Sequence, residues 1–281
     1  MPRYVILYRG RDFEEDELEA ARAAGFVCTD SRMDLRQGDV CIPRYSALPY
    51  YEEQERDMRC VGASMLNTKR EHDYCADLLS YAEDLGSLTP KTWASPSGVS
   101  QEEPGAFVLK GATNSKKFLW SSHMYAADRK AVIEVYSRLL DDTMICQQPI
   151  YVRRYVPLHC FQRSLWDLPI TREFRFFVLD GTILSGGYYW ASHYEELLDR
   201  GCDPTLLDPA QVPADFLQEA ISRIKDRVRF FAIDVAEKFE GGWIVIEVND
   251  GQQSGLSMND PVTLYANLKR VLEAGCPPEA P

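Results

Sequence analysis

Two side chains that can bind a metal stand two positions apart in residues 243–249 (WIVIEVN). If this run is a β-strand, Glu247 and Asn249 point to the same face and present their oxygens side by side. Mg²⁺ prefers hard oxygen ligands and usually takes one or two carboxylates together with substrate phosphates. The pair is therefore a candidate magnesium site. The plainer alternative is a buried strand that runs into the Asn-Asp-Gly turn at residues 249–251.

A second apolar run, residues 230–236 (FFAIDVA), contains one carboxylate, Asp234. A charged side chain inside a hydrophobic strand needs a partner or a metal. Residues 240–242 (EGG) predict a turn between the two runs. We therefore expect an antiparallel hairpin that can set Asp234 opposite Glu247. The predicted metal ligands are Asp234, Glu247 and Asn249.

Several lysines could meet phosphate groups. Lys110 ends the apolar run 107–110, and a loop of small residues follows that carries Lys116 and Lys117. Such a loop can lie over phosphates, but no G-x-x-x-x-G-K-[ST] sequence is present, which argues against a P-loop fold. Taken alone, Lys110 is better explained as a lysine whose stem packs on apolar surface.

Arginines within strand-like segments add to this set. Arg153 and Arg154 are adjacent, so a strand would send them to opposite faces, while Arg172 and Arg175 flank Glu173 in an aromatic run. Arginine suits bidentate capture of phosphate or carboxylate. The alternative is arginine–glutamate pairing within a sheet. Strand-borne cations beside an acidic triad favour a site for nucleotide phosphates and magnesium.

The helices and strands that must position these residues can be predicted from the spacing of apolar residues and from turn residues. Short apolar runs alternate with helical segments up to about Gly86, which predicts a small α/β lobe. Residues 87–98, rich in Pro, Ser and Thr, are the predicted linker. Asp180-Gly181 predicts a hairpin between residues 172–178 and 182–190. Predicted helices cover residues 13–24, 48–59, 71–85, 126–140, 216–229 and 263–274; the remaining predicted strands cover residues 4–8, 38–43 and 149–158.

Composition restricts the class of protein. A chain of 281 residues is long enough for two or three lobes, and its net charge of −12 argues against nonspecific binding to nucleic acid or anionic membranes. No apolar run approaches the length of a membrane span, and the N-terminal run is too short for a signal peptide. The eight cysteines form no CxxC pair, so we expect free thiols and a cytoplasmic protein. The four histidines are isolated in the sequence, and we expect structural or surface roles for them.

These residues resemble the ATP-grasp superfamily, most clearly in Asp234, Glu247 thirteen positions later, and Asn249. In that superfamily the equivalent residues hold magnesium between the ATP phosphates. Other segments are similar to the clade named for two arginines and a lysine, and together they extend the resemblance over most of the chain. They are residues 39–46 (DVCIPRYS), 66–68 (LNT), 107–111 (FVLKG), 114–117 (NSKK), 152–158 (VRRYVPL) and 173–175 (EFR).

The resemblance implies an α/β (α+β) chain with the ATP-grasp fold. A small N-terminal α/β lobe would cover residues 1–95, and the ATP-grasp domain residues 96–281. Within that domain, a central subdomain (96–156) and a C-terminal subdomain with the metal site (157–281) would clasp ATP.

The resemblance also implies roles for single residues. Lys110, and either Lys116 or Lys117, would contact ATP phosphates, and Arg175 would meet phosphate or an acyl-phosphate, which makes Lys110 and Arg175 the expected catalytic pair. The strand of Arg153, Arg154, Tyr155 and Val156 would form the hinge beside adenine. This chain departs from the pattern twice: hinges often carry a glutamate where the two arginines stand, and many relatives have an arginine where this chain has Ala232. Arg175 would supply that missing charge.

The implied activity is an ATP- and Mg²⁺-dependent carboxylate–amine ligase that forms an amide or peptide bond through an acyl-phosphate and releases ADP. One alternative is an ATP-dependent phosphotransferase on the same fold, and another is a non-catalytic nucleotide-binding module. The expected partners are small-molecule or peptide carboxylates and amines, without nucleic acid or membrane and with a homodimer allowed.

Overall fold

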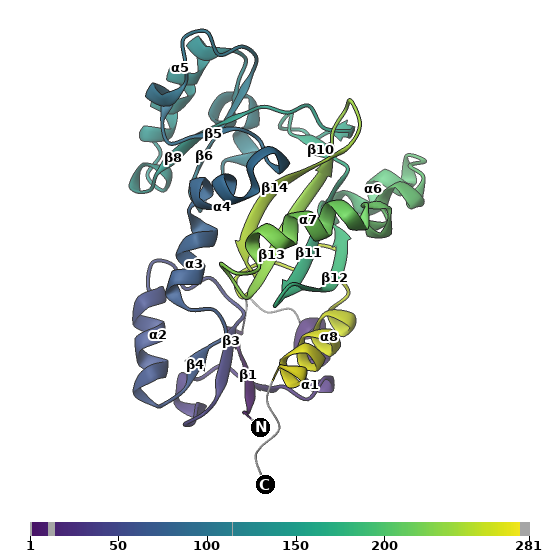
Figure 1. Ribbon diagram of the computed structural model, residues 1–281. Helices are drawn as coiled ribbons and strands as arrows, with labels where there is room; N and C mark the ends of the chain where they lie inside the picture. Colours follow the sequence, from purple (N-terminus) through teal and green to yellow (C-terminus); the bar gives the residue numbers. More distant parts are fainter. Residues whose placement is uncertain (1, 11–14, 114, 276–281) are drawn as a thin grey trace.

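The computed structural model describes residues 2–10, 15–113 and 115–275. Three lobes follow one another in Figure 1, with the N-terminal lobe at the bottom, the C-terminal sheet in the middle and the central lobe at the top. The fold is mixed α/β, as predicted.

The N-terminal lobe is a parallel sheet in the order β2-β1-β3-β4, with helices between its strands. Its strands are β1 (Tyr4–Leu7), β2 (Val27–Thr29), β3 (Val40–Pro43) and β4 (Ser64–Met65), and its helices are α1 (Glu15–Ala23) and α2 (Tyr51–Cys60). Three acidic residues in the first turn of α1 suit the positive end of the helix dipole. The predicted α/β lobe is therefore present, although the first residues of its first predicted helix, 13 and 14, lie outside the described residues.

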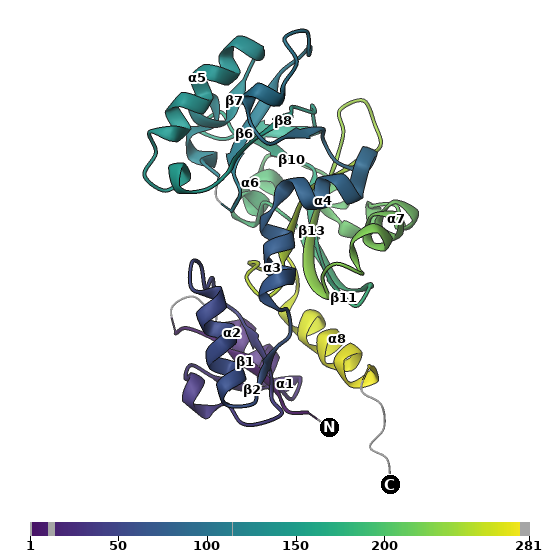
Figure 2. The same ribbon diagram turned by 60° about the vertical axis from the view of Figure 1, so that its left-hand side comes forward.

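Two short helices lead from this lobe to the others (Figure 2): α3 (Lys69–Ala76) and α4 (Leu78–Leu85). The sequence predicted one continuous helix here. The chain leaves helical geometry at Asp77, with φ −94° and ψ 98°, and the Asp77 side chain accepts a hydrogen bond from the Leu79 amide to begin α4. Asp77 therefore breaks the predicted helix and caps its second half.

The central lobe is an antiparallel sheet in the order β5-β8-β6-β7, covered by α5 (Arg129–Leu140). Its strands are β5 (Thr92–Trp93), β6 (Phe107–Gly111), β7 (Tyr125–Ala126) and β8 (Ile150–Arg154). Residues 87–98 were predicted to be a linker, but β5 lies within them and pairs with β8.

The C-terminal part of the chain forms an antiparallel sheet in the order β12-β11-β13-β14. Its strands are β11 (Glu173–Leu179), β12 (Thr182–Tyr188), β13 (Phe230–Glu237) and β14 (Trp243–Asp250), and its helices are α6 (Tyr194–Asp199), α7 (Ala214–Ile224) and α8 (Pro261–Ala274). The predicted hairpin at Asp180-Gly181 is confirmed as β11 and β12. A small hairpin of β9 (Cys160–Arg163) and β10 (Pro169–Thr171) was not predicted.

The two faces of this sheet belong to different cores. One face packs against α7, and the other packs against α8 and the first lobe, where Tyr4 and Phe26 share a core with Phe177 and Phe230. The N-terminal lobe is thereby joined to the sheet that carries the acidic residues, whereas the central sheet and α5 form a separate core.

Within the described part of the chain, no helix is long and apolar enough to cross a membrane. The seven cysteines of that part are free.

Candidate active site

The three predicted metal ligands lie together on the β13–β14 hairpin. Asp234 is directly opposite Glu247 in the strand register, and Asn249 is opposite Ala232. The Asn249 amide donates a hydrogen bond to Asp234 Oδ2 at 3.4 Å. The register shifts immediately after Asp234, and such a bulge re-aims side chains beside a site. The predicted hairpin is confirmed, and it brings the two carboxylates and the amide together.

Arg175 reaches this cluster from the neighbouring strand. It lies opposite Asp234 in the β11–β13 register, and its guanidinium donates two hydrogen bonds to the Asp234 carboxylate, at 2.7 and 2.8 Å. A third goes to the Gly255 carbonyl at 2.9 Å. Burial favours the neutral guanidine, but Asp234 outweighs this effect and raises the pKa of Arg175. Arg175 therefore stays charged beside the predicted metal ligands.

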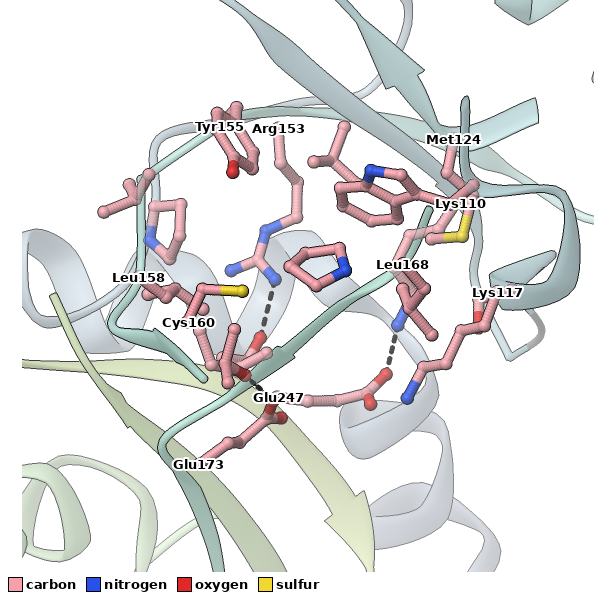
Figure 3. Close-up of a pocket in the computed structure, with 18 of the residues that line it drawn as sticks. Lys110, Lys117, Met124, Arg153, Tyr155, Leu158, Cys160, Leu168, Glu173 and Glu247 are labelled. Atoms are coloured by element: carbon pink, nitrogen blue, oxygen red, sulfur yellow. Dashed lines mark hydrogen bonds and ion pairs between the residues drawn. The ribbon is translucent and has the colours of Figure 1, made fainter. Parts of the chain in front are cut away.

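Lys110 joins the two sheets of the site. It lies near the end of β6 in the central sheet and forms an ion pair with Glu247 of β14 (Figure 3). Burial opposes ionisation of Glu247, but Lys110, Lys117 and Arg175 hold the pKa of its carboxyl at about 2. Glu247 is therefore ionised at neutral pH.

The structure distinguishes the two candidate lysines of the loop. Lys117 lines a cavity between the central and C-terminal sheets. It donates a hydrogen bond to the Tyr189 hydroxyl at 2.5 Å and lies over the Trp190 ring. Burial lowers the pKa of Lys117, but nearby Tyr189, Glu173 and Glu247 raise it overall. Lys116 points elsewhere and pairs with Asp142 at 2.6 Å. Of the two lysines, only Lys117 lines this cavity.

Between the central and C-terminal sheets lies a cavity of about 290 Å³ (Figure 3). Lys110, Lys117 and Glu247 make one part of its wall polar. Most of the rest is aromatic or aliphatic, a composition typical of pockets for small molecules and cofactors. The aromatic and aliphatic lining residues are Pro90, Val108, Trp120, Met124, Tyr155, Val156, Leu158, Leu168, Pro169, Trp190 and Ile246.

The two adjacent arginines of β8 bind different parts of the protein, in keeping with the strand alternation that was predicted. Arg153 is buried and donates to the Ile246 carbonyl at 2.6 Å and to the Thr89 hydroxyl at 2.7 Å. Its burial lowers its pKa. Arg154 pairs with Glu103. Both border the cavity, but their guanidinium groups are engaged with the protein, so Arg153 ties β8 to β14 rather than standing free for a ligand.

Glu173 lines the cavity, and sequence reasoning assigned it no role at the site. It was weighed only as a partner for the flanking arginines, but Arg172 pairs with Glu237 instead, at 2.9 Å. Glu173 accepts a hydrogen bond from the Thr171 hydroxyl at 3.1 Å. Burial raises the pKa of the Glu173 carboxyl to about 7, against the opposing effect of Lys117. Strand alternation could have placed Glu173 at the site, because Glu173 lies on the same face of the strand as Arg175.

This raised pKa makes folding stability depend on pH. The protonated form of Glu173 is favoured in the folded protein, so the stabilisation is complete below the unfolded value of 4.5 and is lost as pH rises through about 7. We expect Glu173→Gln to increase the free energy of unfolding near pH 8 by up to about 3 kcal/mol and to change it little near pH 4. Urea denaturation at both pH values measures this. If Glu173→Gln changed the free energy of unfolding equally at pH 4 and pH 8, the raised pKa of Glu173 would be contradicted.

Two segments of the N-terminal lobe hold the chain that follows β14. Arg44 pairs with Glu17 and donates to the carbonyls of Gly251 at 2.6 Å and Ser254 at 2.8 Å. Asn67 donates to Asp250 Oδ1 at 2.7 Å. The DVCIPRYS and LNT segments therefore support the end of β14 that carries the predicted metal ligands, a role that the sequence did not reveal.

The donor set fits magnesium. Among the described residues, no three His, Cys, Asp or Glu side chains gather into a protein-only metal cage. Two carboxylates and one amide oxygen match an ion that completes its shell with water and substrate phosphates. Asp234, Glu247 and Asn249 are the residues that would hold it.

Comparison with family models gives a match over residues 96–268. The matching model describes the ATP-grasp domain of family 3 in the clade named for two arginines and a lysine. No curated protein sequence matches the chain.

Solved structures give matches along nearly the whole chain. A RimK domain protein ATP-grasp from Sphaerobacter thermophilus DSM 20745 has a TM-score of 0.60 and 16% identity, covering 95% of this chain and 98% of the other. D-cycloserine synthetase DcsG has a TM-score of 0.60 and 13% identity, covering 96% and 99%. The ATP-grasp ligase PsnB, complexed with a variant of its minimal precursor, Mg and ADP, has a TM-score of 0.58 and 11% identity, covering 98% and 97%. At these identities the likeness concerns the fold.

Proposed function

Because this chain belongs to family 3 of the two-arginine, one-lysine clade of ATP-grasp domains, we propose that it is an ATP- and Mg²⁺-dependent ligase that joins a carboxylate to an amine. The observation that carries the proposal is the contact between the two sheets at the cavity. There Lys110 of the central sheet pairs with Glu247 of the C-terminal sheet, beside Asp234, Asn249 and Arg175. Complementary phosphate-binding and metal-binding groups thus meet at the end of an apolar pocket.

The proposed units of the chain follow the predicted boundaries. The central subdomain, residues 96–156, supplies Lys110 and Lys117, and the C-terminal subdomain, residues 157–281, supplies the metal ligands and Arg175. Residues 1–95 would be the N-terminal unit, except that β5 (Thr92–Trp93) pairs with β8 and belongs to the central sheet. The hydrogen bonds of the N-terminal unit to Asp250, at the end of β14, and to Gly251 would support the metal ligands from below in the view of Figure 1.

Each residue has a separate proposed task. Tyr155 and Val156, with the other apolar residues of the cavity wall, hold the adenine base and exclude water. Lys110 and Lys117 bind the phosphates, and Lys110 leaves Glu247 to do so. Mg²⁺ held by Glu247, Asn249 and Asp234 would neutralise the charge that develops on the phosphate oxygens.

Arg175 serves the transferred group in this proposal. Its orientation is fixed by the bidentate contact with Asp234, so it needs no reorganisation when negative charge develops nearby. A carboxylate oxygen of the substrate attacks the terminal phosphorus, and ADP leaves. The amine nitrogen then attacks the acyl carbon, the C–O bond to phosphate breaks, and the nitrogen loses a proton to the departing phosphate, which leaves an amide. Neither step requires a nucleophile from the protein.

The structural relatives support a ligase over the two alternatives. One is a D-cycloserine synthetase, and another is a ligase that holds ADP, Mg and a variant of its precursor. A phosphotransferase would leave a stable phosphorylated hydroxyl instead of an amide. A binding module would have no need of a complete set of metal ligands. Cytoplasmic location and a homodimer stay predictions.

Calorimetry and an activity screen test this proposal together. We expect ATP to bind at least about tenfold more tightly with Mg²⁺ than with EDTA, because the metal offsets the repulsion between phosphate and the site carboxylates. A panel of amino acids and short peptides, assayed for ADP release, should contain at least one active combination. Magnesium-independent ATP binding, or turnover that yields AMP, would contradict the proposal.

A further inference from the structure

A second cavity, of about 210 Å³, adjoins the metal-binding end of β14. Arg175 and Asn249 line it from the C-terminal sheet, and Gln253 lines it from the loop that follows. Ser46 and His72 line it from the N-terminal side of the molecule. This cavity therefore lies beside the proposed site of phosphoryl transfer, and its other wall contains residues such as Ser46 and His72 that have no role in the proposed function.

His72 stands in this wall with a fixed orientation. Its Nδ1 lies 3.1 Å from Asp250 Oδ2, and its ring stacks on Tyr51 with 4.2 Å between ring centroids. Because a carboxylate only accepts hydrogen bonds, Nδ1 carries the proton of this contact. In the neutral ring Nε2 is then a bare acceptor. Sequence reasoning could not anticipate this arrangement, since His72 and Asp250 are 178 residues apart.

Two residues that line this cavity each carry a buried side-chain nitrogen without a hydrogen-bond partner. They are His72 Nε2 and Gln253 Nε2, two of only four such buried side-chain atoms in the described part of the chain. His72 itself is 5% exposed. An unpaired buried polar group costs about 1–3 kcal/mol, so its presence calls for a ligand or a bound water. Two of them in one cavity next to a reaction centre indicate a ligand.

The two atoms specify what that ligand offers. With the neutral ring protonated at Nδ1, His72 Nε2 accepts a hydrogen bond from a donor, and the Gln253 amide nitrogen donates to an acceptor. A molecule with an N–H group close to a carbonyl or carboxylate oxygen satisfies both. The cavity is smaller than the ~300–1,000 Å³ of pockets for drug-sized ligands, so it accommodates one residue rather than a large group.

We propose that this cavity is the amine subsite, and that it takes a primary amine with an adjacent carbonyl or carboxylate oxygen, the chemistry of an α-amino acid or its amide. This inference rests on the proposed ligase function and names the acceptor class for it. His72 accepts a hydrogen bond from the amine, and Gln253 donates one to the oxygen. The amine is thereby held beside Arg175, where the acyl-phosphate would form.

Two sources share this chemistry: a free amino acid and the N-terminal residue of a peptide. A neighbouring hollow of about 220 Å³ has four lining residues in common with the cavity: Ser46, Gln253, Ser254 and Gly255. It offers room for the remainder of a peptide. The experiment must therefore include both kinds of ligand.

Saturation-transfer NMR tests the proposal on the whole chain with Mg²⁺ and a non-hydrolysable ATP analogue. The probes are the common amino acids, their amides and dipeptides, with matched carboxylic acids that lack the amine. We expect at least one amine probe to bind and its deaminated match not to bind. Gln253→Leu and His72→Asn should each weaken that binding by about tenfold or more, the cost of one unpaired hydrogen bond. His72→Asn retains an amide donor for Asp250.

Two variants elsewhere serve as controls. Gln162→Leu removes a glutamine that also has a buried unpartnered atom, and His193→Asn removes a histidine that also faces a carboxylate, Glu196, at 3.2 Å. Neither should change amine binding. If His72→Asn does not fold, Gln253→Leu decides the question.

The outcomes separate the amine subsite from the proposed function. If the ATP analogue binds and no amine probe does, or if the Gln253 and control variants behave alike, the amine subsite is overturned and the proposed function stands. If the analogue itself does not bind in the presence of Mg²⁺, the proposed function fails, and the amine subsite fails with it.

Discussion

Glu247→Gln is expected to lower Mg²⁺-dependent ADP release by at least about a hundredfold, equivalent to about 2.7 kcal/mol of transition-state stabilisation. Glu247 is an ionised carboxylate at the junction of the two sheets, with a pKa of about 2. Glutamine keeps the shape and one oxygen but removes the charge that a metal cation needs. Lys110, its ion-pair partner, is also left without a counter-charge when no nucleotide is bound.

Glu240→Gln is the matched control for this prediction. Glu240 lies in the turn of the same β13–β14 hairpin, and its side chain is exposed. The same chemical change there should leave ADP release within about twofold, since exposed charges far from a site interact weakly in salt. Unchanged turnover in Glu247→Gln would show that Glu247 does not hold the metal.

Asp234→Ala is expected to lower the free energy of unfolding by about 3–5 kcal/mol, in addition to abolishing activity. Asp234 is fully buried and is the bidentate partner of buried Arg175. Removing the carboxylate leaves a guanidinium charge in the interior, where it still donates to the Gly255 carbonyl. Guanidinium denaturation followed by circular dichroism measures the loss.

An exposed pair provides the comparison for Asp234. Asp57 pairs with Arg32 at 2.7 Å, and both side chains are about half exposed. Asp57→Ala should cost less than about 1 kcal/mol. The double variant Asp234→Ala/Arg175→Met should recover part of the lost stability, because no charge is left buried, yet it should stay inactive. If Asp234→Ala and Asp57→Ala lowered the free energy of unfolding equally, burial would not determine the cost of breaking an ion pair in this protein.

The juxtaposition of Asp234, Glu247 and Asn249 could be predicted because it depends on local rules. Strand alternation and one glycine turn were enough to place Asp234 opposite Glu247, and alternation alone separated Arg153 from Arg154. The ATP-grasp fold followed from the resemblance carried by the same residues. Helix ends were harder to predict from the sequence. Asp77 divides one predicted helix, because its side chain caps the second half and competes with continuation of the helix.

Contacts between distant segments could not be predicted from one sequence. The roles of Arg44 and Asn67 depend on the packing of the first lobe against the loop after β14. The pairing of His72 with Asp250 depends on the same docking. The choice between Lys116 and Lys117 depended on the course of an irregular loop, for which alternation gives no rule. In each case the missing information was the tertiary arrangement rather than the residue type.

Oxygen-isotope transfer tests the central claim most directly. The carboxylate substrate found by the ADP-release screen would be labelled with ¹⁸O in both oxygens and converted in the presence of ATP, Mg²⁺ and the amine, with the phosphate followed by ³¹P NMR. Formation of an acyl-phosphate requires that one labelled oxygen leave with the phosphate, so the proposed mechanism predicts ¹⁸O in the inorganic phosphate and an amide that retains one label. ADP formation with unlabelled phosphate, or an amide formed without phosphate release, would contradict it.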